Sequence, residues 1–189
     1  MSETKFMLPR KFQAAGLAAG IKKNGVKDLA LIYSEVPAVM AGTFTQNTLC
    51  AAPVLWDKEL INRQTPGRAV VVNSGVANAC TGEPGLNDTK RTAAKLAEAL
   101  GIRPEEAYVC STGRIGTRLP MDRLEAGIAQ IAPRLSSEGG NEAAEAIMTT
   151  DTRPKKVACE LVVDGITVRI AAMAKGAGMI EPNMATMLA

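Results

Sequence analysis

The last residues of the chain hold its most distinctive candidate for chemistry, the threonine of the closing segment Lys175-Gly-Ala-Gly-Met-Ile-Glu-Pro-Asn-Met-Ala-Thr-Met-Leu-Ala189. A threonine hydroxyl is a weak nucleophile, but it becomes reactive when its own α-amine is free to act as the base. An α-amine has a pKa of about 7.7–8.0, against about 10.4 for lysine, so a useful fraction of it is neutral near pH 7. Thr186 is therefore the candidate nucleophile, provided that the bond between Ala185 and Thr186 is cleaved.

Residue counts exclude several other kinds of site. The chain has no histidine, so it cannot by itself supply a Ser-His-Asp or Cys-His pair or a histidine-ligated metal. The four cysteines lie far apart without a CxxC pair, which favours reduced, buried thiols over disulfides or zinc ligands. We expect no metal, and acid–base chemistry must come from carboxylate, lysine, tyrosine or α-amine groups.

Three glycine-rich segments, each placed directly after a predicted strand, could bring backbone N–H groups close to a ligand. They are residues 73–82, 111–116 and 175–179. None is a nucleotide-binding motif, and glycines required by ordinary turns are an equally good interpretation. A fourth segment, Thr149-Thr-Asp-Thr152, could cap a helix or could hold the amide or carboxylate of a small substrate. The residues alone leave both alternatives open.

The hydrophobic pattern predicts a single domain of mixed α/β class, with α+β layers and no clear internal boundary. Polar and glycine-rich breaks divide the pattern into short strands and amphipathic helices. The predicted elements are a strand hairpin over 30–45 that breaks near 35–37, a buried strand at 69–72, a helix at 89–100 capped by Asp88, a strand ending at Cys110, helices at 121–131 and 140–148, and a hairpin over 156–174 that turns at Asp164-Gly165.

Composition argues against nucleic acid and membrane partners. The net charge is only +3, the 22 Lys and Arg residues are scattered, and aromatics make up 3% of the chain, so bases would find neither a basic patch nor a stacking surface. No run of about 18 apolar residues is present, and the first residues do not form a secretory signal. We expect a cytoplasmic protein.

Taken together, these segments resemble the ArgJ family, the bifunctional ornithine acetyltransferases or glutamate N-acetyltransferases of arginine biosynthesis. The resemblance covers essentially the whole α chain of that family. It rests on five segments in order: Ala14-Ala-Gly-Leu-Ala-Ala-Gly-Ile-Lys22, Asn73-Ser-Gly-Val-Ala-Asn-Ala-Cys-Thr-Gly82, Ser111-Thr-Gly-Arg-Ile-Gly116, Met148-Thr-Thr-Asp-Thr152 and Lys175-Gly-Ala-Gly-Met-Ile-Glu-Pro-Asn-Met-Ala-Thr-Met-Leu188.

The resemblance implies roles for individual residues. The precursor would cleave itself between Ala185 and Thr186, and the new N-terminal Thr186 would carry the acetyl group. Thr112 and Gly113 match the oxyanion-hole pair, and Thr149, Lys175 and Thr186 match substrate-binding positions. As a cation, Lys175 suits a substrate carboxylate.

The family also implies a reaction and an assembly. Acetyl would pass from N2-acetyl-L-ornithine to L-glutamate in a ping-pong cycle without a cofactor, and whether acetyl-CoA also serves as donor is left open. Residues 1–185 would form the α-chain domain and residues 186–189 the start of a β chain, assembled as an α2β2 heterotetramer. Because the chain stops shortly after Thr186, we expect it to be a truncated or uncleaved piece that is inactive alone. The alternatives are a ligand-binding or assembly subunit without catalysis, and an N-terminal-nucleophile amidohydrolase.

Overall fold

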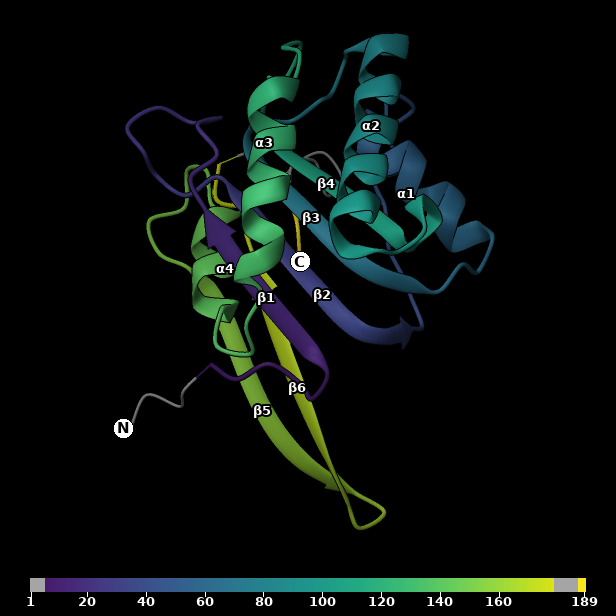
Figure 1. Cartoon of the computed structure of the whole chain (residues 1–189), viewed down its shortest axis with the longest axis vertical. Helices are drawn as coiled ribbons and strands as arrows, with labels where there is room; N and C mark the ends of the chain where they lie inside the picture. Colours follow the sequence, from purple (N-terminus) through teal and green to yellow (C-terminus); the bar gives the residue numbers. More distant parts are fainter. Residues whose placement is uncertain (1–5, 179–186) are drawn as a thin grey trace.

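The computed structural model describes residues 6–178 and 187–189, and a four-stranded sheet lies at its centre (Figure 1). The strand order is β1-β2-β3-β4. Strands β1 with β2 and β2 with β3 pair antiparallel, whereas β3 and β4 pair parallel. The strands are β1 (Phe12–Leu17), β2 (Leu29–Ala38), β3 (Gly67–Val76) and β4 (Ala107–Arg114).

Helices cover both faces of this sheet, which makes the protein a mixed α/β structure as the sequence predicts. The helices are α1 (Ala52–Asn62), α2 (Gly82–Leu100), α3 (Met121–Ile131) and α4 (Gly140–Ala146), with short 3-10 turns at Pro104–Glu106 and Ala132–Arg134. Because strand side chains alternate between faces, Leu31 and Val71 belong to the core cluster that holds Leu96 of α2 and Ile128 of α3. Residues of the opposite parity, such as Val72, lie in a second cluster with α4.

A second sheet consists of only two strands, β5 (Lys155–Val163) and β6 (Ile166–Ala174), which extend away from the body beside α4 (Figure 1). The two residues between them both have positive φ, 50° at Asp164 and 77° at Gly165. Asp-Gly is a preferred pair for such a turn because its twist matches that of the strands. The hairpin predicted over 156–174 is therefore confirmed.

Other predicted elements are confirmed in part. Helix 121–131 coincides with α3, the strand at 69–72 lies inside β3, and α4 begins at Gly140 as expected. The hairpin over 30–45 is wrong, because β2 continues through Pro37 to Ala38. The β2–β3 register shifts between Tyr33 and Ala38, and an irregularity of this kind tolerates a residue without an N–H. The pattern also missed β1 and α1.

Asp88 is not the helix cap that the sequence predicts. It lies inside α2, which begins at Gly82, and its side chain is almost fully buried. Its two carboxylate oxygens accept hydrogen bonds from Arg118, at 2.8 Å and 2.9 Å. A long-range ion pair, which local sequence cannot reveal, therefore accounts for this residue.

No helix among the described residues is long and apolar enough to cross a membrane. All four cysteines are free thiols. The prediction that they are buried is wrong, because Cys80 and Cys159 are exposed and Cys50 and Cys110 are only partly buried. Burial is the main cause that raises the pKa of the Cys110 thiol, and the nearby Asp57 carboxyl raises it further. A thiol in this setting is a poor nucleophile.

Asp57 is a buried carboxyl between α1 and β4. It is 7% exposed, and its Oδ1 accepts a hydrogen bond of 3.0 Å from the backbone N–H of Val109. Burial raises the pKa of Asp57 to about 7, and the hydrogen bonds from Val109 and Cys110 only partly oppose this rise. The charged form of Asp57 therefore destabilises the folded protein.

We predict that Asp57→Asn stabilises the protein increasingly as the pH rises from about 4 to about 7, with no further change above that. In this window the unfolded chain carries ionised Asp57 while the folded chain still binds the proton, so wild-type stability falls with pH. The difference between about 7 and the ordinary 3.8 limits the gain to about 4 kcal/mol. Urea denaturation of the complete wild-type and variant proteins at several pH values measures it, and a pH-independent difference would contradict the prediction.

Candidate active site

The parallel pairing of β3 and β4 brings two of the glycine-rich segments together at the carboxyl ends of these strands. Ser74 is paired with Thr112, and Gly75 with Gly113. Gly113 has φ of 134° and Gly75 of 115°, and a Cβ on Gly113 would lie 2.3 Å from the backbone carbon of Gly75. Both the backbone conformation and the close approach therefore require glycine here, and these strand ends expose main chain.

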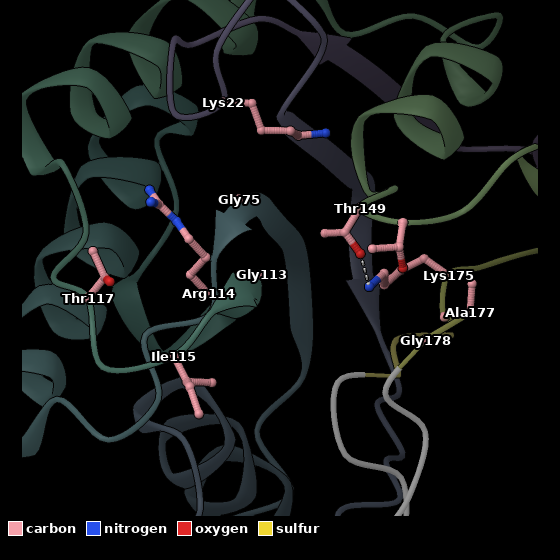
Figure 2. Close-up of a pocket in the computed structure, with 12 residues that line it drawn as sticks. Lys22, Gly75, Gly113, Arg114, Ile115, Thr117, Thr149, Lys175, Ala177 and Gly178 are labelled. Atoms are coloured by element: carbon pink, nitrogen blue, oxygen red, sulfur yellow. Dashed lines mark hydrogen bonds between the residues drawn. The ribbon is translucent and has the colours of Figure 1, made fainter.

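The ammonium of Lys175 links these strand ends to two other parts of the chain. Lys175 is 2% exposed, and its Nζ donates a hydrogen bond to Thr112 Oγ1 at 2.9 Å. It also donates to Thr149 Oγ1 at 2.7 Å (Figure 2). An ammonium only donates, so each threonine oxygen acts as the acceptor and its own hydroxyl hydrogen is directed elsewhere. Lys175 thereby orients two hydroxyl groups as donors.

Asp151 holds the backbone around these hydroxyls. Its carboxylate accepts hydrogen bonds from Lys155 Nζ at 2.5 Å, from the N–H of Gly176 at 2.9 Å and from the N–H of Thr149 at 3.3 Å. Burial acts to raise the pKa of Asp151, but these hydrogen bonds and the charge of Lys155 outweigh it and hold the pKa at about 2. Asp151 therefore stays ionised and ties the segment of Thr149 to the end of β6.

Burial also lowers the pKa of Lys175 itself, while the carboxylate of Asp151 opposes this effect and the charge of Lys155 adds to it. Among the described residues, the carboxylate of Asp151 interacts with the ammonium groups of both Lys155 and Lys175.

A pocket of about 800 Å³ opens between these elements. Figure 2 shows Arg114 and Thr117 on one side of it, Thr149 and Lys175 on the other, and Lys22 at the top of the view. The volume suits an amino-acid-sized or larger ligand. The residues that line it are Lys22, Gly75, Gly113, Arg114, Ile115, Thr117, Thr149, Thr150, Lys175, Gly176, Ala177 and Gly178.

Lys22 reaches this pocket from the loop between β1 and β2. The buried carboxylate of Asp28 closes that loop by accepting hydrogen bonds from the N–H of Ala19 at 2.6 Å and of Lys22 at 2.7 Å. The Lys22 side chain donates to the carbonyl oxygen of Met148 at 2.8 Å. A segment near the N-terminus thus contacts the residue before Thr149.

The structure brings together four of the site residues predicted from the sequence, namely Thr112, Gly113, Thr149 and Lys175. Ala185 and Thr186 lie outside the described residues. Leu188, which is described, forms an isolated antiparallel bridge with Lys175, with N···O distances of 2.8 Å and 3.3 Å. The last residues of the chain therefore return to the site.

One alternative for the threonine segment is wrong. No helix begins at residues 149–152, which lead instead into β5, so these side chains cap no helix. Sequence reasoning gave no individual role to Lys22, Asp28 or Asp151. Their positions in the sequence could have indicated them, because Lys22 and Asp151 lie within the quoted motif segments and Asp28 follows the first of these segments. Among the described residues, no group of three acidic or cysteine side chains is arranged to hold a metal ion.

Fold and site define a mixed α/β protein whose glycine-lined strand ends, oriented hydroxyls and cationic side chains suit a small anionic ligand. Residues 13–189 match the model of the ArgJ family, and the chain belongs to that family.

Curated relatives are similar in sequence to this chain over most of its length. The arginine biosynthesis bifunctional protein ArgJ of Symbiobacterium thermophilum is 57% identical over 184 residues, which cover 95% of this chain and 45% of the relative. The ArgJ protein of Caldanaerobacter subterraneus is 52% identical and covers 97% of this chain and 45% of its own length. The chain thus spans about half the length of the curated relatives it matches.

Two solved structures share the fold. The crystal structure of ArgJ from Bacillus halodurans has a TM-score of 0.88 at 42% identity, and the match covers 96% of this chain and 95% of that one. An ornithine acetyltransferase from Mycobacterium tuberculosis, crystallised with ornithine, has a TM-score of 0.87 at 45% identity over 98% of both chains.

We predict that Asp151→Ala lowers the free energy of unfolding of the complete protein by about 2–4 kcal/mol, because it leaves the partly buried N–H groups of Thr149 and Gly176, together with Lys155, without their acceptor. Asp122→Ala, at an exposed position of α3, is the control and should change it by less than about 0.5 kcal/mol. The folded-state pKa of Asp151 lies below its ordinary value, so its contribution is present above about pH 4 and declines toward pH 2. Urea denaturation measures both, and equal losses in the two variants would contradict the assignment.

Proposed function

We propose that the complete protein is a glutamate N-acetyltransferase of arginine biosynthesis, which transfers acetyl from N2-acetyl-L-ornithine to L-glutamate through Thr186. The observation that carries the proposal is the Lys175 ammonium bound to both Thr112 and Thr149 beside an open pocket. Membership of the ArgJ family and a relative crystallised with ornithine support the reaction and the substrate class.

A described residue that follows Thr186 closely in the sequence supports the proposed nucleophile. Leu188 pairs with Lys175, and Thr186 precedes Leu188 by two residues. Two residues of chain span at most about 7 Å. The bridge between Leu188 and Lys175 therefore supports the choice of Thr186 as the nucleophile.

The chain would first cleave itself. The Thr186 hydroxyl attacks the carbonyl of Ala185, its proton passes to the departing nitrogen, and an ester replaces the peptide bond. Water then hydrolyses the ester, which releases the carboxylate of Ala185 and leaves a threonine with a free α-amine as its base. Gly176, with φ of 145°, gives the preceding segment a backbone conformation that other residues rarely adopt.

Transfer would proceed in two half-reactions of the same chemistry. Thr186 takes the acetyl group from N2-acetyl-L-ornithine and releases ornithine, and glutamate then takes the acetyl group from the acyl-threonine. Each half-reaction forms a tetrahedral oxyanion, for which the Thr112 hydroxyl and the Gly113 N–H are the donors. Because Lys175 occupies an acceptor position of Thr112 Oγ1, the hydroxyl hydrogen is left to donate to the oxyanion. Thr149 and Lys175 would contact the substrate.

We further propose that residues 1–185 form an α chain, that residue 186 begins a β chain, and that the two assemble as an α2β2 heterotetramer. The solved ornithine acetyltransferase chain matches over 98% of its own length, although curated relatives are about twice as long as the match. A separate polypeptide of about this length in that structure supports cleavage into two chains. Free thiols support a reducing, cytoplasmic location.

The β5–β6 hairpin has one face that suits the β chain as partner. One face of the hairpin packs against the rest of the protein through Ala158, Ala171 and Met173. On the same face, Arg169 donates a hydrogen bond to the carbonyl oxygen of Leu8. The opposite face of the hairpin is apolar in every paired position beyond Lys155, which lies at its base, and most of its residues are substantially exposed. We call this surface the outer hairpin face; it consists of Val157, Cys159, Leu161, Val163, Ile166, Val168, Ile170 and Ala172. An apolar face of this extent indicates a partner, and the part of the relatives that this chain does not match is long enough to supply it.

We predict that Thr186→Ala abolishes processing of the complete protein, so that a denaturing gel shows one band where wild type shows two. Thr186→Ser is the control, since it keeps the hydroxyl and should still be cleaved. Normal processing of Thr186→Ala would refute the assignment of Thr186 as the nucleophile.

On incubation with N2-acetyl-L-ornithine, mass spectrometry of wild type should find an added acetyl group on the first residue of the β chain. A binding subunit would show no acetyl, and an amidohydrolase would release acetate without glutamate. The same assay with acetyl-CoA decides whether it is a second donor.

We predict that Leu161→Asp, on the outer hairpin face, weakens retention of the β chain by a tagged α chain at least about tenfold, because an apolar contact worth about 1.5–3 kcal/mol is replaced by a charge. Thr167→Asp introduces the same charge on the opposite parity of the hairpin and is the control. Equal retention of the β chain by Leu161→Asp and wild type would rule out this face.

A further inference from the structure

The pocket has an unusual charge balance. Three of its lining residues, Lys22, Arg114 and Lys175, are cations, and none of the described residues that line it is acidic. Burial is the main cause that lowers the pKa of Lys22, Asp28 opposes it, and the charge of Lys175 lowers the pKa further, so the two ammonium groups that line the pocket repel one another. Like charges in a partly desolvated space destabilise one another, and an anion bound between them relieves that cost.

Two parts of the fold fix the position of Lys22. Asp28, with 0% exposure, accepts from its backbone N–H at 2.7 Å and so holds the loop. Gly75 lies against the side-chain stem, where an added Cβ would be 3.0 Å from Lys22 Cγ. The carboxylate of Asp28 therefore fixes the backbone of Lys22, and the lack of a side chain at Gly75 leaves room for the Lys22 side chain. The Lys22 ammonium is directed along the pocket (Figure 2).

The Lys22 ammonium is only partly satisfied. Among the described residues its one hydrogen bond goes to the neutral carbonyl of Met148, and no carboxylate lies within ion-pair distance of it. Burial is the largest influence and lowers the pKa of Lys22, while Asp28 acts in the opposite direction. Lys27 and Lys155, by contrast, pair directly with Glu145 and Asp151. Lys22 therefore has two N–H groups for an anion that enters the pocket.

We propose that Lys22 is a substrate-binding residue that holds the α-carboxylate common to N2-acetyl-L-ornithine and L-glutamate. This inference rests on the proposed function. Both substrates carry the α-carboxylate next to the nitrogen that loses or gains the acetyl group, so it must lie close to the reacting atoms. The far end of ornithine is an ammonium, which three pocket cations would repel, so the α-carboxylate end faces them.

Lys22 suits this role better than Lys175. Lys175 is 2% exposed and already donates to two hydroxyls, whereas Lys22 remains partly exposed. The assignment leaves Lys175 to orient Thr112 and Thr149 and to add positive charge. Lys22 in turn anchors the carboxylate and, through Met148, the chain before Thr149.

The test compares carboxylate substrates with their α-carboxamides in the complete, processed protein. Lys22→Met keeps the apolar stem without the charge, Lys22→Arg keeps the charge, and Lys23→Met is the matched control at the adjacent, exposed position. We expect Lys22→Met to lower kcat/KM for N2-acetyl-L-ornithine about 10–100-fold, mainly through KM, as expected for loss of a charge-assisted hydrogen bond. Its kcat/KM for N2-acetyl-L-ornithinamide should change little, so the preference for carboxylate over amide falls by a similar factor.

Glutamate and its α-amide should respond in the same way as acceptors. Lys22→Arg should keep most of the preference for carboxylate, and Lys23→Met should match wild type. A role confined to holding Met148 would lower kcat/KM for carboxylate and amide equally, and that result, like an unchanged preference, would overturn the proposal. Should Lys22→Met fail to process, Lys22→Gln, which retains a donor for Met148, is measured in its place.

A separate binding measurement distinguishes failure of this inference from failure of the proposed function. If wild type transfers no acetyl, the proposed function is wrong, and calorimetric titration with N2-acetyl-L-ornithine and its amide still decides the role of Lys22. Loss of the carboxylate preference in Lys22→Met but not in Lys23→Met supports the proposal. The same preference in both variants, or none in wild type, refutes it.

Discussion

The site depends on the burial of the Lys175 side chain among hydrogen-bond acceptors. A buried cation must find acceptors, and here two hydroxyls from separate segments, Thr112 and Thr149, provide them. Asp151 lies close enough to favour the charged form and also holds the backbone of Gly176. One electrostatic requirement thereby connects the end of β4, the segment after α4 and the end of β6.

The sheet supplies the rigid part of this arrangement. Parallel pairing puts the carboxyl ends of β3 and β4 side by side, and the contact of Gly75 with Gly113 lets the two main chains approach closely. Side chains at these two positions would prevent that approach. Helices on both faces bury the sheet, which keeps these strand ends in place. The outer hairpin face and the cationic pocket are the surfaces that we propose for a partner and a substrate.

Much of the fold could be predicted from local pattern, and its failures have physical causes. Helix α3 and the Asp164-Gly165 turn were predicted because each depends on residues close in the sequence. Asp88 was misassigned because its partner, Arg118, lies 30 residues away. The strand β2 was divided at Pro37 because a register irregularity that accommodates proline leaves no mark in the hydrophobic pattern.

By itself the sequence determined which chemistry is possible. Without histidine, a threonine with a free α-amine is an available nucleophile, and the resemblance to the ArgJ family implied site roles for Thr112, Gly113, Thr149 and Lys175. Only the tertiary structure decided how these residues act. The hydroxyls accept from Lys175, which leaves them as donors, and Lys22 arrives from a distant loop to complete a cationic pocket. The reason is that charge balance and hydrogen-bond direction depend on distances between segments far apart in the chain.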